Sequence, residues 1–123
     1  MAMKNKVLRA VSSAASLGAV LAAALFFSPM PVLAADAAVK IDNFTFDPPR
    51  LVVKAGTTVT WQNNDDIPHT VVASGKAFRS KTLDTDDKYT FTFTTPGSYE
   101  YFCSLHPHMT GSIVVEAATG ATQ

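Results

Sequence analysis

Sulfur-containing residues are scarce in the part of this 123-residue chain that follows residue 34. That part holds one cysteine, Cys103, and one methionine, Met109, and the whole chain has three histidines. A lone cysteine cannot close a disulfide within the chain, so its thiol is either a liability or a working group. Its neighbours along the chain favour a working group.

Helical periodicity is also missing. Beyond the first 38 residues, no stretch is both long enough and periodic enough for a substantial helix. Short β-type runs alternate with turn residues instead: Val59 and Trp61 alternate with threonines, and so do Phe91 and Phe93. The sequence therefore predicts an all-β sandwich. Residues 74–87 leave open a loop, a short irregular strand or one helical turn. Strands are expected at residues 39–46, 51–54, 57–63, 70–73, 88–94, 98–103 and 111–116.

The N-terminus has little charge beyond three cationic residues. An uncharged apolar run over 10–27 follows them, and small residues lie at 32–34. This pattern is typical of a secretory signal peptide, so we expect residues 1–34 to be removed on export. The alternative is an uncleaved membrane anchor, the one route by which the chain would contact a membrane. No twin arginine precedes the apolar run, which favours export of an unfolded chain to the bacterial periplasm or its equivalent.

Basic residues are not in excess in the remaining part of the chain. The whole chain has ten Lys and Arg against ten Asp and Glu, and three of the cations lie before residue 35. Seven cations against ten anions give residues 35–123 a net charge of −3. This balance argues against nucleic acid as a partner. The length suffices for one small domain and is too short for two.

Four of the scarce residues form one constellation. Cys103, His106 and Met109 follow one another at intervals of three, and His69 lies further upstream in Pro68-His69. A thiolate, two imidazoles and a thioether suit copper. Two histidines and a cysteine in a trigonal plane, with methionine as a weak and long axial ligand, form a blue-copper electron-transfer site. We therefore predict one copper ion at His69, Cys103, His106 and Met109.

Each of these residues also has an ordinary explanation. A single cysteine is often a small buried hydrophobic residue, a methionine fills gaps in a core, and a histidine occupies a turn. Taken separately, these roles do not account for a cysteine, a histidine and a methionine within seven residues beside a strand end. His108 differs, because it is expected to be an exposed loop residue rather than a fifth ligand.

The order of the ligands along the chain predicts their roles. Cys103 has the same strand parity as Tyr101, so both should point into the sandwich. His69 approaches from another strand end and should be the more buried histidine. His106, on the loop to Met109, should lie nearest solvent and serve as the exit of the electron, with Met109 tuning the potential.

These residues resemble the cupredoxins, and the short Cys-x-x-His-x-x-Met loop is most similar to that of the amicyanins. The motifs are Gly56–Trp61, Pro68-His69 and Gly97–Gly111, and the resemblance covers Val39–Glu116. It implies an eight-stranded Greek-key sandwich and one type 1 copper ion. It also implies a carrier that shuttles one electron between larger redox proteins outside the cytoplasm.

Three positions depart from the pattern of these relatives. Thr70 stands where many have an asparagine that ties the two ligand loops together, so that hydrogen bond is either replaced or lost. Leu105 stands where amicyanins have proline, which leaves open whether His106 can protonate and leave reduced copper. His108 stands where they have phenylalanine beside the partner-binding face, so a methylamine dehydrogenase partnership is not carried over.

The sequence supports one leading function and two alternatives. The leading one is a monomeric electron carrier whose donor and acceptor proteins touch the loop around His106 over less than about 1,200 Å² in total. The second is a copper carrier or buffer that transfers the metal itself, favoured only by His108. The third is an enzyme with Cys103 as nucleophile and His106 as base. The sequence offers no oxyanion device and no third residue to orient the base, so we do not expect an enzyme. A dinuclear copper centre lacks its second cysteine, and multicopper oxidases and copper nitrite reductases need more histidines.

Overall fold

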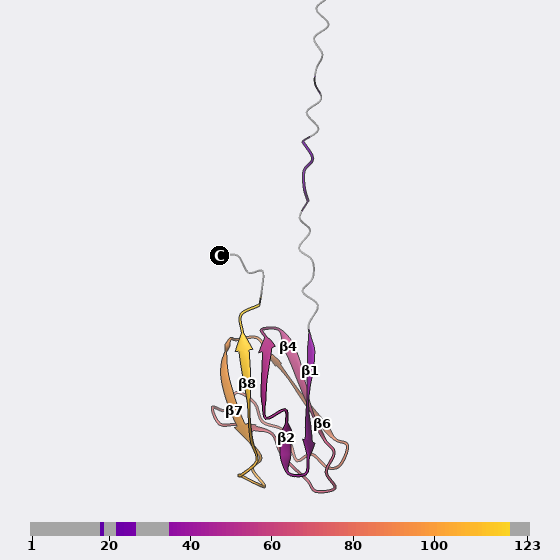
Figure 1. The fold of residues 1–123 in the computed structure, drawn as a ribbon, viewed down its shortest axis with the longest axis vertical. Coiled ribbons are helices and arrows are strands. Elements are labelled where there is room, and N and C mark those ends of the chain that lie inside the picture. Colours follow the sequence, from indigo (N-terminus) through magenta and orange to yellow (C-terminus); the bar gives the residue numbers. More distant parts are fainter. Residues whose placement is uncertain (1–17, 19–21, 27–34, 119–123) are drawn as a thin grey trace, which may run out of the picture. The chain divides into compact units, whose positions relative to one another are not determined.

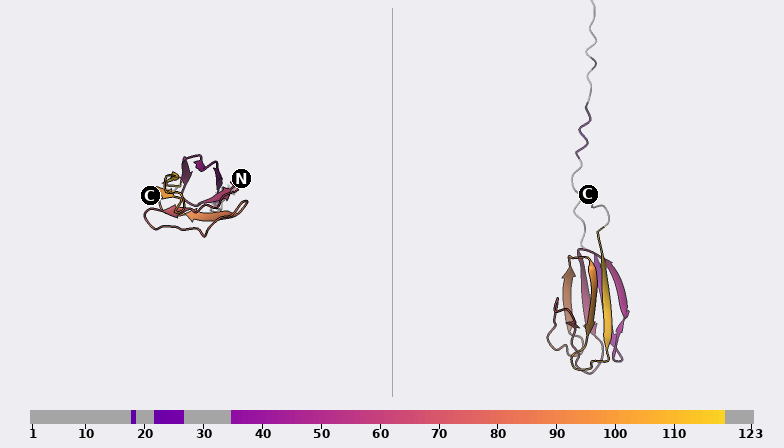
Figure 2. Two further views of the ribbon diagram at one scale, coloured as in Figure 1. Left: turned by 90° about the horizontal axis from the view of Figure 1, so that it is seen from below. Right: turned by 90° about the vertical axis from the view of Figure 1, so that its left-hand side faces the viewer.

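The computed structural model describes residue 18, residues 22–26 and residues 35–118. Within residues 35–118 all regular structure is β, in two four-stranded sheets that face each other (Figures 1 and 2). This architecture confirms the predicted all-β sandwich. The strands are β1 (Asp36–Asp42), β2 (Thr45–Asp47), β3 (Arg50–Lys54), β4 (Thr57–Asn63), β5 (Val72–Ala73), β6 (Lys88–Phe93), β7 (Gly97–Phe102) and β8 (Thr110–Glu116).

The predicted signal peptide at residues 1–34 lies outside the described residues except for residues 18 and 22–26, and it stays a prediction. In the described part of the chain no helix has the length and apolar character needed to cross a membrane.

The strand order places both ends of residues 103–109, called the metal loop below, in one sheet. One sheet has the order β2-β1-β4-β6 and the other β3-β8-β7-β5. The pairs β1 with β4 and β3 with β8 are parallel, and the remaining pairs are antiparallel. Cys103 directly follows β7 and Met109 directly precedes β8, so the loop between them joins two hydrogen-bonded neighbours. A short connection between paired strands has few conformations, which suits a site of fixed geometry.

The core forms because apolar residues alternate along the strands. Every second residue of β4 is buried, and Trp61 is fully enclosed. Its indole lies against the rings of Phe78, Phe93 and Tyr101 at centroid distances of 5.6, 6.3 and 5.5 Å. Burial raises the pKa of Tyr101 to about 12, so its phenol stays neutral at physiological pH. This aromatic cluster therefore gives the small domain a rigid hydrophobic core.

The prediction of one strand over 39–46 is wrong, because a turn at Asn43 and Phe44 divides it into β1 and β2. Both turn residues have positive φ, 51° and 58°. Val39 and Ile41 are buried on one parity and Phe46 on the other, so a continuous strand would have put one group into solvent. The turn restores both groups to the core.

The strand expected at 39 begins three residues earlier, and several other strand ends, including that of β7 before Cys103, shift by one residue. Larger differences lie around β5. The strand expected at 70–73 shortens to Val72–Ala73. Of the three forms left open for 74–87, the segment adopts a loop with turns and two isolated bridges, from Val72 to Arg79 and from His69 to Leu83. The second bridge holds the His69 backbone through two hydrogen bonds with Leu83.

Gly111 is required by the Tyr101 ring, which lies directly across the β7–β8 pair. A Cβ at Gly111 would fall 2.5 Å from Tyr101 Oη and 2.9 Å from its Cε2. We therefore predict that Gly111→Ala lowers the free energy of unfolding by about 1–3 kcal/mol, because the ring must leave its packed position. Gly75→Ala is the control, since a Cβ there meets no atom within 4 Å. Denaturant titration measures both variants, and equal stabilities would contradict the packing argument.

Candidate metal centre

Three of the four predicted ligands converge at one end of the sandwich. The Nδ1 atoms of His69 and His106 lie 3.8 and 3.7 Å from Cys103 Sγ and 3.2 Å from each other. All three donor atoms therefore fall within 4.8 Å of one another. In such a triangle a point in the plane lies about 2 Å from each corner, close to the lengths of metal bonds to imidazole nitrogen and thiolate sulfur. The donor triangle fits a single metal ion.

The loop after β7 is held by its own backbone. The Cys103 N–H donates to the Met109 carbonyl at 3.1 Å, and the Met109 N–H donates to the His106 carbonyl at 2.9 Å. Cys103 and Met109 are both buried and belong to the hydrophobic core cluster. The loop therefore fixes a thiol, an imidazole and a thioether relative to one another before any metal binds.

His69 is oriented by a carboxylate that the sequence did not reveal. Its Nε2 lies 2.7 Å from Asp65 Oδ2, and the ring is fully buried. An ionised carboxylate can only accept hydrogen bonds, so Nε2 carries the proton and Nδ1 keeps a lone pair for the metal. The available signal was an aspartate four residues before a ligand histidine, a spacing that is too common in loops to be specific.

Asp65 is itself anchored by the turn between β1 and β2. Its Oδ1 accepts the Asn43 N–H at 2.6 Å, and its Oδ2 accepts the Phe44 N–H at 3.0 Å. Burial raises the pKa of this carboxyl, but the hydrogen bonds from Phe44, His69 and Asn43 lower it by more, so its pKa lies below the ordinary value. Asp65 is therefore ionised at neutral pH and keeps its role as an acceptor.

Thr70 ties the loop of His69 to the loop of Cys103. Its backbone N–H donates to Cys103 Sγ at 3.4 Å. Its hydroxyl accepts the Ser104 N–H at 2.8 Å and lies 2.7 Å from the Ser104 hydroxyl. The two ligand loops are thus tied together through a threonine and a serine, which settles the question that this substitution left open.

The remaining loop residues differ in exposure. His69 is fully buried whereas His106 is partly exposed, as the order of the ligands predicted. Leu105 is 49% exposed, and His108 is exposed and not a member of the donor triangle. The side of the site that faces solvent is therefore that of His106.

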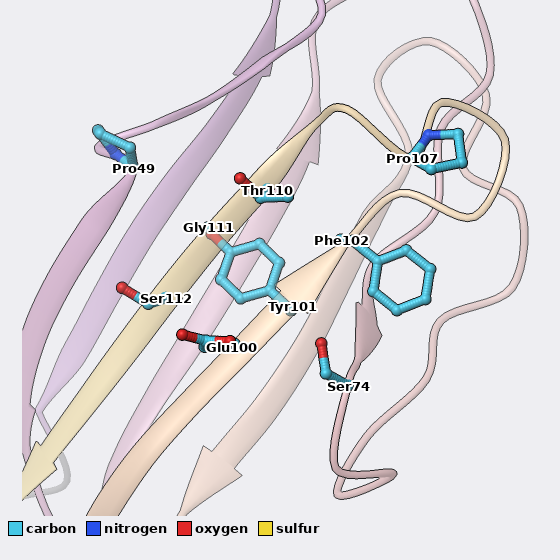
Figure 3. A pocket seen from close by; sticks show the side chains of 9 residues that line it. All are labelled: Pro49, Ser74, Glu100, Tyr101, Phe102, Pro107, Thr110, Gly111 and Ser112. Atoms are coloured by element: carbon cyan, nitrogen blue, oxygen red, sulfur yellow. The ribbon is translucent and has the colours of Figure 1, made fainter.

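A shallow depression of about 500 Å³ lies on the outer face of the β7–β8 pair and is separate from the donor triangle (Figure 3). Glu100 is the one charged group among its lining residues, and no histidine or cysteine lines it. Its lining comprises Pro49, Ser74, Glu100, Tyr101, Phe102, Pro107, Thr110, Gly111 and Ser112.

The comparisons with known proteins all give the same family. The model of the cupredoxin-like domain matches residues 17–115. Amicyanin-alpha of Methylorubrum extorquens is 36% identical over 119 residues, covering 93% of this chain and 100% of the relative. Amicyanin of Paracoccus versutus is 38% identical over 99 residues, covering 72% of this chain and 75% of the relative. A solved Cu(I) form of an amicyanin mutant is 37% identical with a TM-score of 0.62, covering 67% of this chain and 83% of that one.

The Thr70 link between the loops can be tested directly. We predict that Thr70→Val, which keeps the side-chain shape, lowers the free energy of unfolding of the metal-free protein by about 1–2 kcal/mol, because Ser104 N–H loses its acceptor. Thr92→Val is the matched control, since the Thr92 hydroxyl bonds Thr58 on the exposed face of its sheet. Chemical denaturation of both variants measures the difference. Equal losses would show that Thr70 does not tie the loops.

Proposed function

The chain belongs to the cupredoxin-like family, and from this we propose that it is a one-electron carrier, with a copper ion bound by His69, Cys103, His106 and Met109. The observation that carries the proposal is the donor triangle of two Nδ1 atoms and one Sγ within 4.8 Å. Thiolate and imidazole together, with a thioether in the same loop, are the ligands of a blue-copper site. Bound copper supplies a Cu(II)/Cu(I) couple that takes up and releases one electron.

The residues around the triangle keep the ligands still, which is what fast electron transfer needs. Asp65 holds the His69 ring, and the Thr70 N–H holds the Cys103 sulfur. A hydrogen bond to the sulfur also withdraws charge from the thiolate, which raises the reduction potential of such a site. Met109, buried at the end of the same loop, is the proposed axial ligand and would tune that potential further.

His106 is the proposed point of electron exit because it is the ligand with access to solvent. Leu105 beside it is 49% exposed, and Phe44 near its ring is 43% exposed. An exposed ligand edge with apolar neighbours suits a brief contact with donor and acceptor proteins, below about 1,200 Å² of total burial. We propose that the carrier acts as a monomer.

The proposed location is the bacterial periplasm or an equivalent compartment outside the cytoplasm. The charge and apolar pattern of residues 1–34 supports export of the domain that begins at residue 35. A buried and hydrogen-bonded thiol is also protected from the disulfide exchange that an oxidising compartment promotes.

Transfer of the metal itself is the alternative function. It would be served by an exposed donor near the site, and His108 is the one candidate in the metal loop. His108 is not part of the donor triangle, whereas His69 and Cys103 of that triangle are fully buried and are held by Asp65 and Thr70. A braced and largely buried site favours retention of the metal and movement of electrons.

The colour of the loaded protein tests the proposal. We expect the Cu(II) protein to show an intense visible thiolate-to-copper band that bleaches reversibly on reduction, and Cys103→Ala to abolish it. His108→Ala is the control and should keep the band, because His108 is not a proposed ligand. Absorption spectra of the three proteins measure this. A colourless Cu(II) adduct of the intact protein would overturn the electron-carrier proposal.

The axial role of Met109 has its own test. We predict that Met109→Leu keeps the band but shifts the reduction potential, because a weak axial ligand tunes the metal without building the trigonal plane. His69→Ala should instead disrupt the band, because it removes a corner of the donor triangle. Spectroelectrochemistry measures both properties. A potential unchanged in Met109→Leu would show that Met109 is not the axial ligand.

A further inference from the structure

Phe44 adopts a backbone conformation that phenylalanine rarely takes. It follows Asn43 in the turn between β1 and β2, and both residues have left-handed φ values, 58° and 51°. Such turns favour glycine and asparagine, because a side chain crowds the following carbonyl in this conformation. Phe44 is also 43% exposed, so its ring is only partly buried. Strained residues of this kind persist where the surroundings hold them, often at functional sites.

The surroundings that hold Phe44 are those that hold His69. Asp65 Oδ2 accepts the Phe44 N–H at 3.0 Å and contacts His69 Nε2 at 2.7 Å, so one oxygen serves both residues. Asp65 Oδ1 accepts the Asn43 N–H. The turn and the buried histidine therefore share one anchor, and the place of the Phe44 backbone is fixed relative to the metal centre.

From this backbone the Phe44 ring contacts both histidines of the donor triangle. Its centroid lies 5.4 Å from that of His69 and 5.1 Å from that of His106, with interplanar angles of 87° and 88°. These values are typical of favourable edge-to-face pairs. His69 is already fixed by Asp65 and by complete burial, so it gains little from the contact. His106 is partly exposed, so the Phe44 ring covers a part of its imidazole that would otherwise be more accessible to solvent.

The geometry points to Phe44 as a positioning residue for His106: the strained turn holds its ring against the exposed imidazole and keeps His106 Nδ1 directed at the donor triangle. This inference rests on the proposed role of His106 as a ligand. The positioning role explains why phenylalanine occupies a turn that it fits poorly. Glycine or asparagine would relieve the strain but would leave the His106 imidazole without this aromatic contact.

Phe44→Gly separates positioning from folding. Glycine suits the left-handed turn, and this relief offsets part of the stability lost with the ring, so the variant should stay folded while the His106 ring becomes more mobile. Ring mobility is measured by ¹³C relaxation of the His106 imidazole in the metal-free protein. In the copper-loaded protein, release of Cu(I) to a chelator should become about fivefold faster, the change expected from loss of one aromatic pair. Val52→Ala in β3 is the control, because Val52 has the same exposure of 43% and should change neither measurement.

Phe44→Asn provides a second variant that tolerates the left-handed turn if the glycine variant folds poorly. If either folded variant leaves both His106 mobility and copper release within about twofold of the parent, the positioning role is overturned. A variant that loses stability without a change in His106 mobility also overturns it, because Phe44 would then serve the fold alone. Failure of the proposed function would look different: the parent protein would lack the visible copper band, while the metal-free relaxation measurement would still report on Phe44.

Discussion

The structure depends on a constraint between two loops that are far apart in the sequence. A trigonal set of ligands requires His69 to meet Cys103 and His106, which lie 34 and 37 residues further along the chain. Thr70 satisfies this requirement through its N–H on the Cys103 sulfur and its hydroxyl on Ser104. Both bonds are made by protein groups alone, so the protein itself sets the distances between the donors that a metal ion would meet.

Asp65 supplies the second part of this constraint, from the other side of the site. Its carboxylate joins the β1–β2 turn to His69 and leaves the histidine's Nδ1 free to face the sulfur. The Asp65 carboxylate therefore has two roles. It accepts the backbone N–H groups of the turn, and it orients the ligand His69. Such shared bonds make the centre rigid, and a rigid centre needs little ligand movement when an electron arrives or leaves.

The residues around the donor triangle differ in depth. Thr70 is buried and joins the two ligand loops through its N–H on the Cys103 sulfur and its hydroxyl on Ser104. Leu105 and His108 are exposed on the loop that carries the partly exposed His106. The buried groups therefore fix the positions of the ligands, and the exposed ones form the surface beside them.

Alternation and residue type are local properties, so they suffice to predict the all-β class, most strand positions, the four candidate ligands and the relative burial of the two histidines. The sequence did not reveal the turn at Asn43 and Phe44. Asp42-Asn43 are turn-forming residues, but a β-type pattern resumes directly at Phe44, and only the packing of both flanks requires a reversal. The sequence also did not reveal the roles of Asp65, Thr70 and Phe44. Each of these roles depends on a contact between distant parts of the chain, as between Asp65 and Asn43 across 22 positions. Such contacts exist only once the two sheets are packed, so the tertiary structure alone decided them.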